Sequence, residues 1–528
     1  MLILQNLAYI HPNKELLFNN IDLVVNNHEK IALVGNNGIG KSTLLKIIAG
    51  ELQPSSGVFN INMKPYYVPQ VFGQYNYITI AQALHIEDKL KALHEIIAGN
   101  VTEHNMYLLD DDWTVEERLK EALQYWKINE LNLYQPLSTL SGGQKTKLFL
   151  AGIFINNPEL VLLDEPGNHL DNEGRQLLYD YIQSTSTTLI VVSHDRKLLN
   201  LLNVVCELNR NGIVAYGGNY DFYAEQKSIE QNAFHEDVKS KEKALRKAKE
   251  KERTIKERRQ KLDAKGRKKQ EKAGMPAIVM HSLRNSAERS TSKLKDIHAE
   301  KINGLVNELQ TLRKILPGIN TMRFEFDDAT LHKGKILFRA KNINFNYGNG
   351  LLWQQNLDVE ITSGERIAFK GLNGSGKTTL IKIILGVSNV STGTIYSAID
   401  NAVYIDQDYS LINNQLSVYE QAQLFNKSLL QENEIKNRLN RFLFSKEFWD
   451  KPCSSLSGGE RMRLMLCCLA IGNHAPDVIV LDEPTNNLDI QNTEILTTVI
   501  NEYKGTLIVV SHDEYFLDGI NLHRVISL

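Results

Sequence analysis

The chain has 528 residues, a formal net charge of −2 and four cysteines. This length predicts roughly three to four domain-sized units with large buried cores. The first residues lack the charged, apolar and small-residue segments of a signal peptide, and no apolar run approaches the ~18 residues that span a bilayer. We therefore expect neither secretion nor a membrane-spanning role. The cysteines lack metal-ligand spacing and a paired framework, which predicts buried thiols in a cytoplasmic protein; they are Cys206, Cys453, Cys467 and Cys468.

The opening run MLILQNLAYI predicts a strand, and two glycine-rich segments further on repeat one pattern 336 residues apart: GNNGIGKST at 35–43 and GLNGSGKTT at 371–379. Each follows an apolar strand-like run and precedes a helical pattern, which is the context of a phosphate-binding loop. A single match could be a chance glycine-rich turn, but two matches at corresponding positions exclude that interpretation. The chain is therefore predicted to be built twice around such a loop.

Each residue type in these loops has a physical reason to be there. Glycines let backbone N–H groups converge on the β- and γ-phosphates of ATP, a lysine supplies a point charge, and a hydroxyl reaches Mg²⁺. The following helix adds its positive dipole end. The predicted nucleotide-binding residues are Gly35, Asn36, Asn37, Gly38, Ile39, Gly40, Lys41, Ser42 and Thr43, and Gly371, Leu372, Asn373, Gly374, Ser375, Gly376, Lys377, Thr378 and Thr379. Of these, Ser42 and Thr378 are the predicted metal ligands.

Two further pairs of residues correspond when the halves are aligned. His11 and Tyr347 both stand 24 residues before the first glycine of their loop, where a flat ring can stack on adenine. A surface or core ring is the alternative for both. Gln70 and Gln407 end extended stretches and can ligand Mg²⁺ or position water, whereas an ordinary loop glutamine is the alternative. Between Gln70 and the next motif, apolar spacing predicts a helical subdomain.

The segments LSGGQ at 140–144 and LSGGE at 456–460 each enter a helical pattern. A serine and two glycines at a helix N-terminus form an anion site, because free N–H groups are not screened by side chains. Alone, such a segment could be a simple N-cap. Its duplication beside phosphate-binding loops predicts contact with nucleotide through Ser141, Gly142, Gly143, Ser457, Gly458 and Gly459.

Two buried strand patterns, LVLLDEP at 160–166 and VIVLDEP at 478–484, deliver paired carboxylates at their ends. Asp164 and Asp482 suit the Mg²⁺ water shell. Glu165 and Glu483 suit a group that orients or deprotonates the attacking water, and a helix cap is the alternative.

A further strand pattern in each half ends in SHD, at His194 and His512. A histidine at that place can reach the γ-phosphate. A lone histidine would more often be structural.

With these motifs repeated in one order, the chain resembles the ATP-binding cassette ATPases over nearly all of both halves. The resemblance implies a head-to-tail sandwich in which the first loop and Glu165 face Ser457–Gly459, while Lys377 and Glu483 face Ser141–Gly143. Two ATP molecules with Mg²⁺ would then be hydrolysed between the halves of a monomer. One departure is Gly167, where the second half has Thr485 and the family usually has threonine, which puts the symmetry of the two sites in question.

Between the halves lies a long, charged, helix-favouring segment. Residues 239–295 hold 21 Lys and Arg against 7 Asp and Glu, an excess of +14 in a chain of net charge −2. Gly274 and Pro276 interrupt the helical pattern, which predicts an antiparallel hairpin with its tip around Ala277–Met280. A solvated spacer is the alternative. Clustered cations on such an element favour a phosphate-backbone partner, and the absence of aromatic residues from the run argues against base reading.

Twin cassettes joined by a charged linker look like the ABC-F proteins. That resemblance implies a translation role: the ATP-bound protein enters the ribosomal E site, contacts rRNA, and directs its linker toward P-site tRNA, in translation regulation, stall relief or antibiotic resistance. The first half carries about 21 extra residues between Gln70 and Ser141, which leaves room for a short arm. We expect no C-terminal extension after Leu528.

The predicted fold class is α/β, with two tandem ATP-binding cassette (P-loop NTPase) domains joined by a long basic α-helical hairpin. The expected domains are a first cassette at 1–221, a linker at 222–325 and a second cassette at 326–528. Two other functions stay open: the ATP-binding subunit of a membrane transporter and a DNA-directed ATPase clamp. The lack of a spanning segment and the linker charge argue against the first, and comparing stimulation by ribosomes with stimulation by DNA separates the second.

Overall fold

The computed structural model describes residues 1–128, 131–270, 299–312, 334–348, 350–372, 374–427, 429–472, 476–486 and 488–528. The chain divides into two compact units: Met1–Asp221 together with Met322–Leu528, and Phe222–Thr321. The predicted hairpin tip, the helix breakers Gly274 and Pro276, and the loop residue Asn373 lie outside the described residues. The three-domain division stays a prediction.

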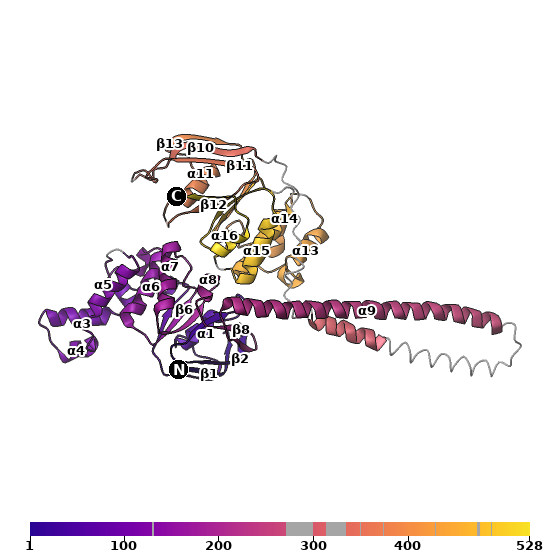
Figure 1. The fold of residues 1–528 in the computed structure, drawn as a ribbon, viewed down its shortest axis with the longest axis horizontal. Helices are drawn as coiled ribbons and strands as arrows, with labels where there is room; N and C mark the ends of the chain where they lie inside the picture. Colours follow the sequence, from indigo (N-terminus) through magenta and orange to yellow (C-terminus); the bar gives the residue numbers. More distant parts are fainter. Residues whose placement is uncertain are drawn as a thin grey trace. The chain divides into compact units, whose positions relative to one another are not determined.

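The first half contains an antiparallel sheet ordered β2-β1-β4 and a largely parallel sheet ordered β5-β6-β7-β3-β8-β9 (Figure 1). Its strands are β1 (Leu2–Ile10), β2 (Leu16–Val25), β3 (Lys30–Val34), β4 (Ser56–Ile61), β5 (Pro65–Val68), β6 (Leu160–Asp164), β7 (Thr188–Val192), β8 (Val204–Asn209) and β9 (Gly212–Tyr216). Its α-helices are α1 (Lys41–Ile48), α2 (Ile80–Ala83), α3 (Glu87–Ile97), α4 (Glu103–Leu109), α5 (Val115–Tyr125), α6 (Gly142–Asn156), α7 (Asn172–Ser184) and α8 (Arg196–Leu199).

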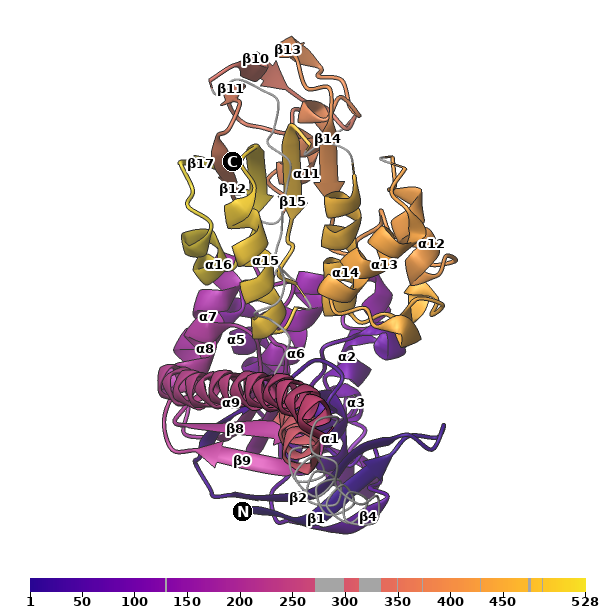
Figure 2. The ribbon, with the colours of Figure 1, turned by 90° about the vertical axis from the view of Figure 1, so that its right-hand side faces the viewer.

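The second half repeats this plan, with an antiparallel sheet ordered β11-β10-β13 and a parallel sheet ordered β14-β15-β16-β12-β17. In Figure 2, α15 runs beside the parallel strands. The strands are β10 (Ile336–Asn344), β11 (Leu357–Thr362), β12 (Arg366–Lys370), β13 (Thr392–Ser397), β14 (Ala402–Ile405), β15 (Val478–Asp482), β16 (Thr506–Val510) and β17 (Arg524–Ser527). The α-helices are α11 (Lys377–Ile384), α12 (Val418–Leu424), α13 (Glu432–Arg441), α14 (Gly458–Ile471), α15 (Ile490–Glu502) and α16 (Glu514–Gly519).

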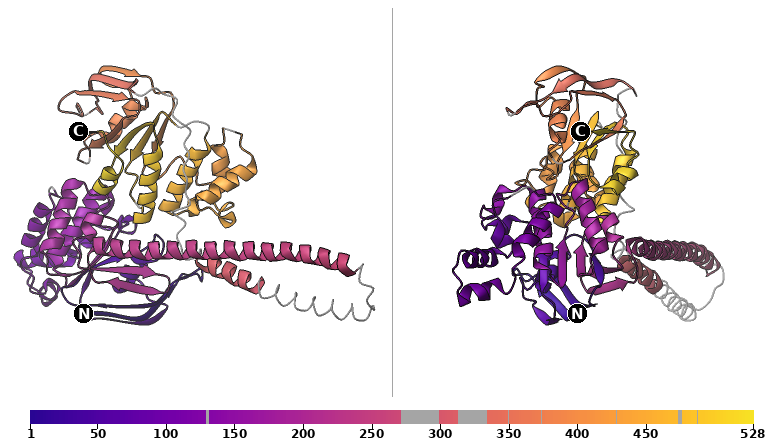
Figure 3. Two further views of the ribbon diagram at one scale, coloured as in Figure 1. Left: turned by 45° about the vertical axis from the view of Figure 1, so that its right-hand side comes forward. Right: turned by 60° about the vertical axis from the view of Figure 1, so that its left-hand side comes forward.

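The central strands of each parallel sheet are buried along their whole length, which explains their unbroken apolar sequences. Apolar side chains from the antiparallel sheet, the parallel sheet and the first helix form one core in each half. Thus α11 lies between its two sheets (Figure 3). Because parallel strands run the same way, the carboxyl ends of β3, β6 and β7 share one edge, where the predicted site residues begin.

The expected helical subdomain is present as α2 to α5, and helices α3 and α5 carry their buried residues on one face. The four cysteines are free and buried, as predicted. The α/β class with tandem halves is confirmed.

The second unit contains most of α9 (Tyr220–Gln270), a single helix of 51 residues that Figure 1 shows as an uninterrupted rod. Residues 299–312 form another helix. An ion pair between Lys241 and Glu308 joins the two helices, and Leu309 is buried. The long helix is therefore compatible with the predicted linker. Within the described ranges, each helix is either too short or too polar to span a bilayer.

Candidate active site

The first phosphate-binding loop connects β3 to α1, which confirms the predicted strand–loop–helix context. Gly40 caps the helix with φ 106°, and a Cβ atom there would lie 2.7 Å from Leu17 Cδ2. Only glycine fits this conformation and this space. Lys41 Nζ donates to the carbonyl oxygens of Gly35 at 2.6 Å and Asn36 at 3.3 Å, and burial lowers the pKa of Lys41. The loop thus folds around its own lysine.

The acidic pair lies at the end of the central strand, as its sequence predicts. Asp164 is the last residue of β6 and accepts a hydrogen bond from the Tyr67 hydroxyl at 3.0 Å. In the second half Tyr404 donates to Asp482 at 2.8 Å, and the Thr378 hydroxyl lies 3.5 Å from the same carboxylate oxygen. Sequence reasoning missed both tyrosines, although each stands three residues before its aligned glutamine and so repeats like the other motifs.

The two glutamates share an unusual backbone conformation, with φ 52° at Glu165 and φ 50° at Glu483. Left-handed backbone is costly for a residue with a Cβ atom, and such strain concentrates at functional sites. Burial raises the pKa of Glu165 to about 8 and of Glu483 to about 7. The positive charge of Lys41 opposes this shift at Glu165, and that of Arg175 opposes it at Glu483. Carboxyl groups whose pKa lies near 7 are suited to proton transfer with water at neutral pH.

Three buried carboxylate oxygens fit a hard cation and its water. Oδ1 of Asp164 and Oε1 of both Glu165 and Glu483 have no hydrogen-bond partner within the described part of the chain. No cluster of three or more His, Cys, Asp or Glu side chains in those same ranges is arranged to hold a metal unaided. Mg²⁺ commonly takes one or two protein carboxylates and completes its shell with phosphate and water. The oxygens of Asp164 and Glu165 at the first site therefore fit a magnesium ion and its water that arrive with a nucleotide, and that of Glu483 fits the same role at the second site.

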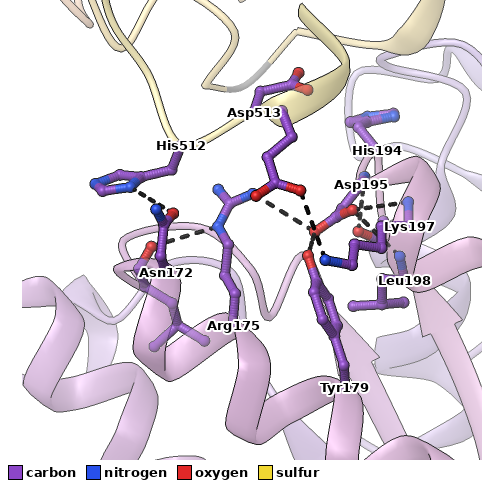
Figure 4. A network of polar contacts seen from close by, with 12 residues as sticks. Asn172, Arg175, Tyr179, His194, Asp195, Lys197, Leu198, His512 and Asp513 are labelled. Atoms are coloured by element: carbon purple, nitrogen blue, oxygen red, sulfur yellow. Dashed lines mark hydrogen bonds and ion pairs between the residues drawn. The ribbon is translucent and has the colours of Figure 1, made fainter. Parts of the chain in front are cut away.

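The two predicted histidines lie beside these glutamates. His194 Nε2 lies 3.3 Å from Glu165 Oε1 and 3.2 Å from Asn37 Oδ1. His512 Nε2 lies 3.5 Å from Glu483 Oε1, while its Nδ1 forms a hydrogen bond of 2.9 Å with Asn172 Oδ1 (Figure 4). Burial lowers the pKa of His194 well below its usual range and the pKa of His512 to about 4. Both rings are therefore neutral at pH 7.

A cavity of about 360 Å³ gathers most of the first predicted site. Both halves contribute to its lining. From the first half come His11, Asn37, Gly38, Gly40, Lys41, Ser42, Thr43, Gln70, Asp164, Glu165 and His194, and from the second come Ser457 and Gly458. In addition, the Asn37 backbone N–H donates to Asp489 Oδ2 of the second half at 3.2 Å. The second LSGG segment therefore faces the first phosphate-binding loop.

The second site is built from the same local contacts. Lys377 Nζ donates to Gly371 O at 2.7 Å and to Leu372 O at 3.0 Å. The Tyr347 hydroxyl lies 2.8 Å from Thr379 Oγ1, and the Tyr347 side chain is 66% exposed, so its ring is accessible to a base. Gln407 is also exposed. The roles of Tyr347 and Gln407 stay predictions.

Both LSGG segments form helix N-termini with capping boxes. Ser141 caps α6, with its hydroxyl accepting from the Gln144 N–H, and Ser457 caps α14 in the same way through Glu460. These reciprocal bonds hold the serines in place while the next N–H groups remain at the start of the helix. Both segments therefore stand at helix N-termini, as their sequences predict, and their contact with nucleotide stays a prediction.

Replacing Glu165 and Glu483 by glutamine should stabilise the ATP-free protein at alkaline pH. Both folded-state pKa values lie above the unfolded value of 4.5, so above that pH the native state keeps protons that the unfolded chain has lost. The free energy of unfolding therefore falls as pH rises, and the loss is complete once pH has passed the folded values of about 7 and about 8. Glutamine mimics the protonated form at every pH. Thermal melts should show the variant more stable than wild type at pH 9 and nearly equal at pH 5; equal melting at pH 9 would contradict the burial argument.

Comparisons with known proteins agree with this fold and these repeated motifs. A family model described as "ABC transporter" matches residues 18–168 and 354–486. "Putative ATP-binding protein YdiF" of Bacillus subtilis is 32% identical, with 97% of this chain and 77% of the relative covered. "ABC transporter F family member 5" of Arabidopsis thaliana is 30% identical over 95% of this chain and 71% of the relative. An archaeal ribosome recycling factor, aABCE1, solved with a stalk protein, shares the fold at TM-score 0.59 and 20% identity, over 99% of this chain and 87% of that one.

The duplicated motifs, the two parallel sheets and these matches lead to one assignment. Cassettes of this family bind ATP and hydrolyse it. The chain belongs to the ATP-binding cassette family and is a tandem-cassette ATPase of the ABC-F type.

Proposed function

We propose that the chain binds two ATP molecules with Mg²⁺ between its paired halves and that their hydrolysis controls how long it remains bound to the ribosome. The observation that carries the nucleotide part is the first cavity, which brings Lys41, Glu165 and Ser457 together from opposite halves. Lys41 would balance phosphate charge, and Ser42 with Asp164 would hold the ion that neutralises charge on the reacting phosphates. Glu165 would orient water and accept its proton. Lys377, Thr378, Asp482 and Glu483 would do the same at the second site.

Nucleotide at such a site would connect the halves, because its phosphates would meet the loop of one half and the α14 N-terminus of the other. The backbone N–H groups of an N-terminus favour an anion. The pairing is intramolecular in this proposal, and the protein acts as a monomer.

The ribosomal part of the proposal rests on the charge of the linker. Arg246 and Arg253 of α9 are 82% and 83% exposed, although each also pairs with a glutamate one turn later. Further exposed lysines follow the same helix, namely Lys247, Lys249, Lys251 and Lys256. A cationic rod of this kind suits the phosphate backbone of rRNA and of P-site tRNA. The structural neighbour titled a ribosome recycling factor gives the fold a precedent at the ribosome; translation regulation, stall relief and antibiotic protection are the outcomes that such binding would serve.

Changing Lys247, Lys249, Lys251 and Lys256 to glutamine should weaken ribosome binding in a salt-dependent way. The slope of log affinity against log salt is negative, and each lost phosphate contact reduces its magnitude by roughly 0.7–0.9. Losing four contacts should therefore reduce that magnitude by about 3. ATPase activity without ribosomes should be unchanged. The matched control replaces the same four lysines by arginine and should bind like wild type. An unchanged slope in the glutamine variant would reject α9 as the contact, and equal binding to duplex DNA would favour a DNA-directed clamp.

A further inference from the structure

The two predicted catalytic histidines are held by different partners. His194 lies 3.2 Å from Asn37 of its own phosphate-binding loop, whereas His512 reaches across to Asn172 of the first half at 2.9 Å. Asn172 is the first residue of α7, and Asp171 caps that helix. The equivalent first residue of α15 is Ile490, whose apolar side chain offers no hydrogen bond to His194. Helix α7 thus supplies a polar contact to the second site, and α15 has no equivalent polar residue for the first site.

One turn further along α7, Arg175 lines a second cavity, which lies between the two halves. Its Nε donates to Leu170 O at 3.4 Å and its Nη1 lies 3.5 Å from Asp195 Oδ2, while Tyr179 also hydrogen-bonds this carboxylate (Figure 4). Only 14% of the Arg175 side chain is exposed. These contacts fix the guanidinium on the side of α7 where Figure 4 shows His512 and Asp513.

The surrounding cavity is shared by both halves and holds both histidines. Its lining includes Glu165, Asn172, Arg175, His194 and His512. The charged groups that face Arg175 there include Asp195 of its own half and Asp513 and Glu514 of the other. At the positions on α15 that correspond to Arg175 and Tyr179, the sequence has Thr493 and Thr497. No cation therefore stands on α15 at the place that Arg175 occupies on α7.

We propose that Asn172 and Arg175 are positioning residues for the second ATP site, through which the first half orients His512 and Glu483 of the second half. Helix α15 has no equivalent residues that would orient His194 and Glu165. Asn172 fixes the imidazole of His512 through Nδ1, leaving Nε2 directed at Glu483. Arg175 supplies a fixed positive charge beside that pair and links it to Asp195, which follows His194 directly. The two ATP sites are consequently unequal, and the second depends on α7.

The test isolates each site, and it rests on the proposed function only for the assignment of the catalytic glutamates. Glu165→Gln leaves the second site active, and Glu483→Gln leaves the first. Adding Arg175→Thr, which installs the residue found on α15, should lower kcat about tenfold in the Glu165→Gln background with KM for ATP within twofold. In the Glu483→Gln background the same change should alter kcat less than twofold. Arg175→Lys should restore most of the lost rate, and Gln176→Ala, an exposed neighbour bonded to Asp180, should change neither background.

Equal loss of kcat in both backgrounds, or no loss in the Glu165→Gln background, would overturn the inference. A second readout does not depend on hydrolysis and so separates this inference from the proposed function. In protein labelled at histidine, the imidazole signals of His512, assigned with His512→Gln, should shift in Asn172→Ala and in Arg175→Thr, while those of His194 stay in place. Unmoved His512 signals, or equal shifts at both histidines, would refute the trans contact even if neither single-glutamate variant hydrolyses ATP.

Discussion

The double variant Glu165→Gln, Glu483→Gln is expected to lose ATP turnover by ~10²–10⁴-fold, the range that a positioned general base contributes. Glutamine keeps the size and most polar contacts of the buried side chain but cannot accept a proton from water. Because Lys41 and Lys377 are untouched, ATP binding should survive. Phosphate release and equilibrium nucleotide binding should be measured on the same preparation. The control Glu173→Gln changes an exposed carboxylate on α7 and should retain full turnover.

A result in which the double variant still hydrolyses ATP within tenfold of wild type would remove both glutamates from the reaction. Their left-handed backbone, and their buried oxygens without a hydrogen-bond partner in the described part of the chain, would then need a structural explanation. Loss of binding together with turnover would instead mean that the glutamates hold the nucleotide.

The second large effect is expected from Gly458→Asp. Gly458 lines the first cavity together with Lys41, so an added carboxylate would face the phosphates. Two like charges about 4 Å apart repel by about 4 kcal/mol at the effective dielectric of a protein surface. In the Glu483→Gln background, where only the first site works, ATP hydrolysis should fall by at least ~100-fold.

The fold should tolerate this substitution, because an acidic residue in the first turn of α14 interacts favourably with the helix dipole. Gly142→Asp is the matched reciprocal control: it should silence the Glu165→Gln background and spare the Glu483→Gln background. If Gly458→Asp instead impaired only the second site, the head-to-tail pairing of the halves would be wrong.

Much of this architecture was predictable because the same sequence motifs occur in both halves of the chain. Repetition turned weak motifs, such as a serine at a helix start or a histidine after a strand, into specific ones. Strand–loop–helix order at Lys41 and the carboxylate at the end of β6 then follow from elementary patterning. The same repetition would also have revealed Tyr67 and Tyr404, had the aligned aromatic positions been compared.

Other features could not come from sequence patterns. The left-handed backbone of Glu165 depends on how β6 joins the following turn, and the pKa shifts depend on burial by distant segments. The contact of Asn172 with His512 joins residues 340 positions apart, and it breaks the repeat instead of following it. Asymmetry of this kind becomes visible only when both halves are placed together.

The ribosomal role is tested by ATP-dependent co-sedimentation of the Glu165→Gln, Glu483→Gln protein with purified ribosomes. The variant should pellet with ribosomes in ATP and Mg²⁺, stay in the supernatant without nucleotide, and be released by high salt. If the ATP-bound variant remains in the supernatant at low salt, and ribosomes leave the wild-type ATPase rate unchanged, then the ribosomal role is wrong.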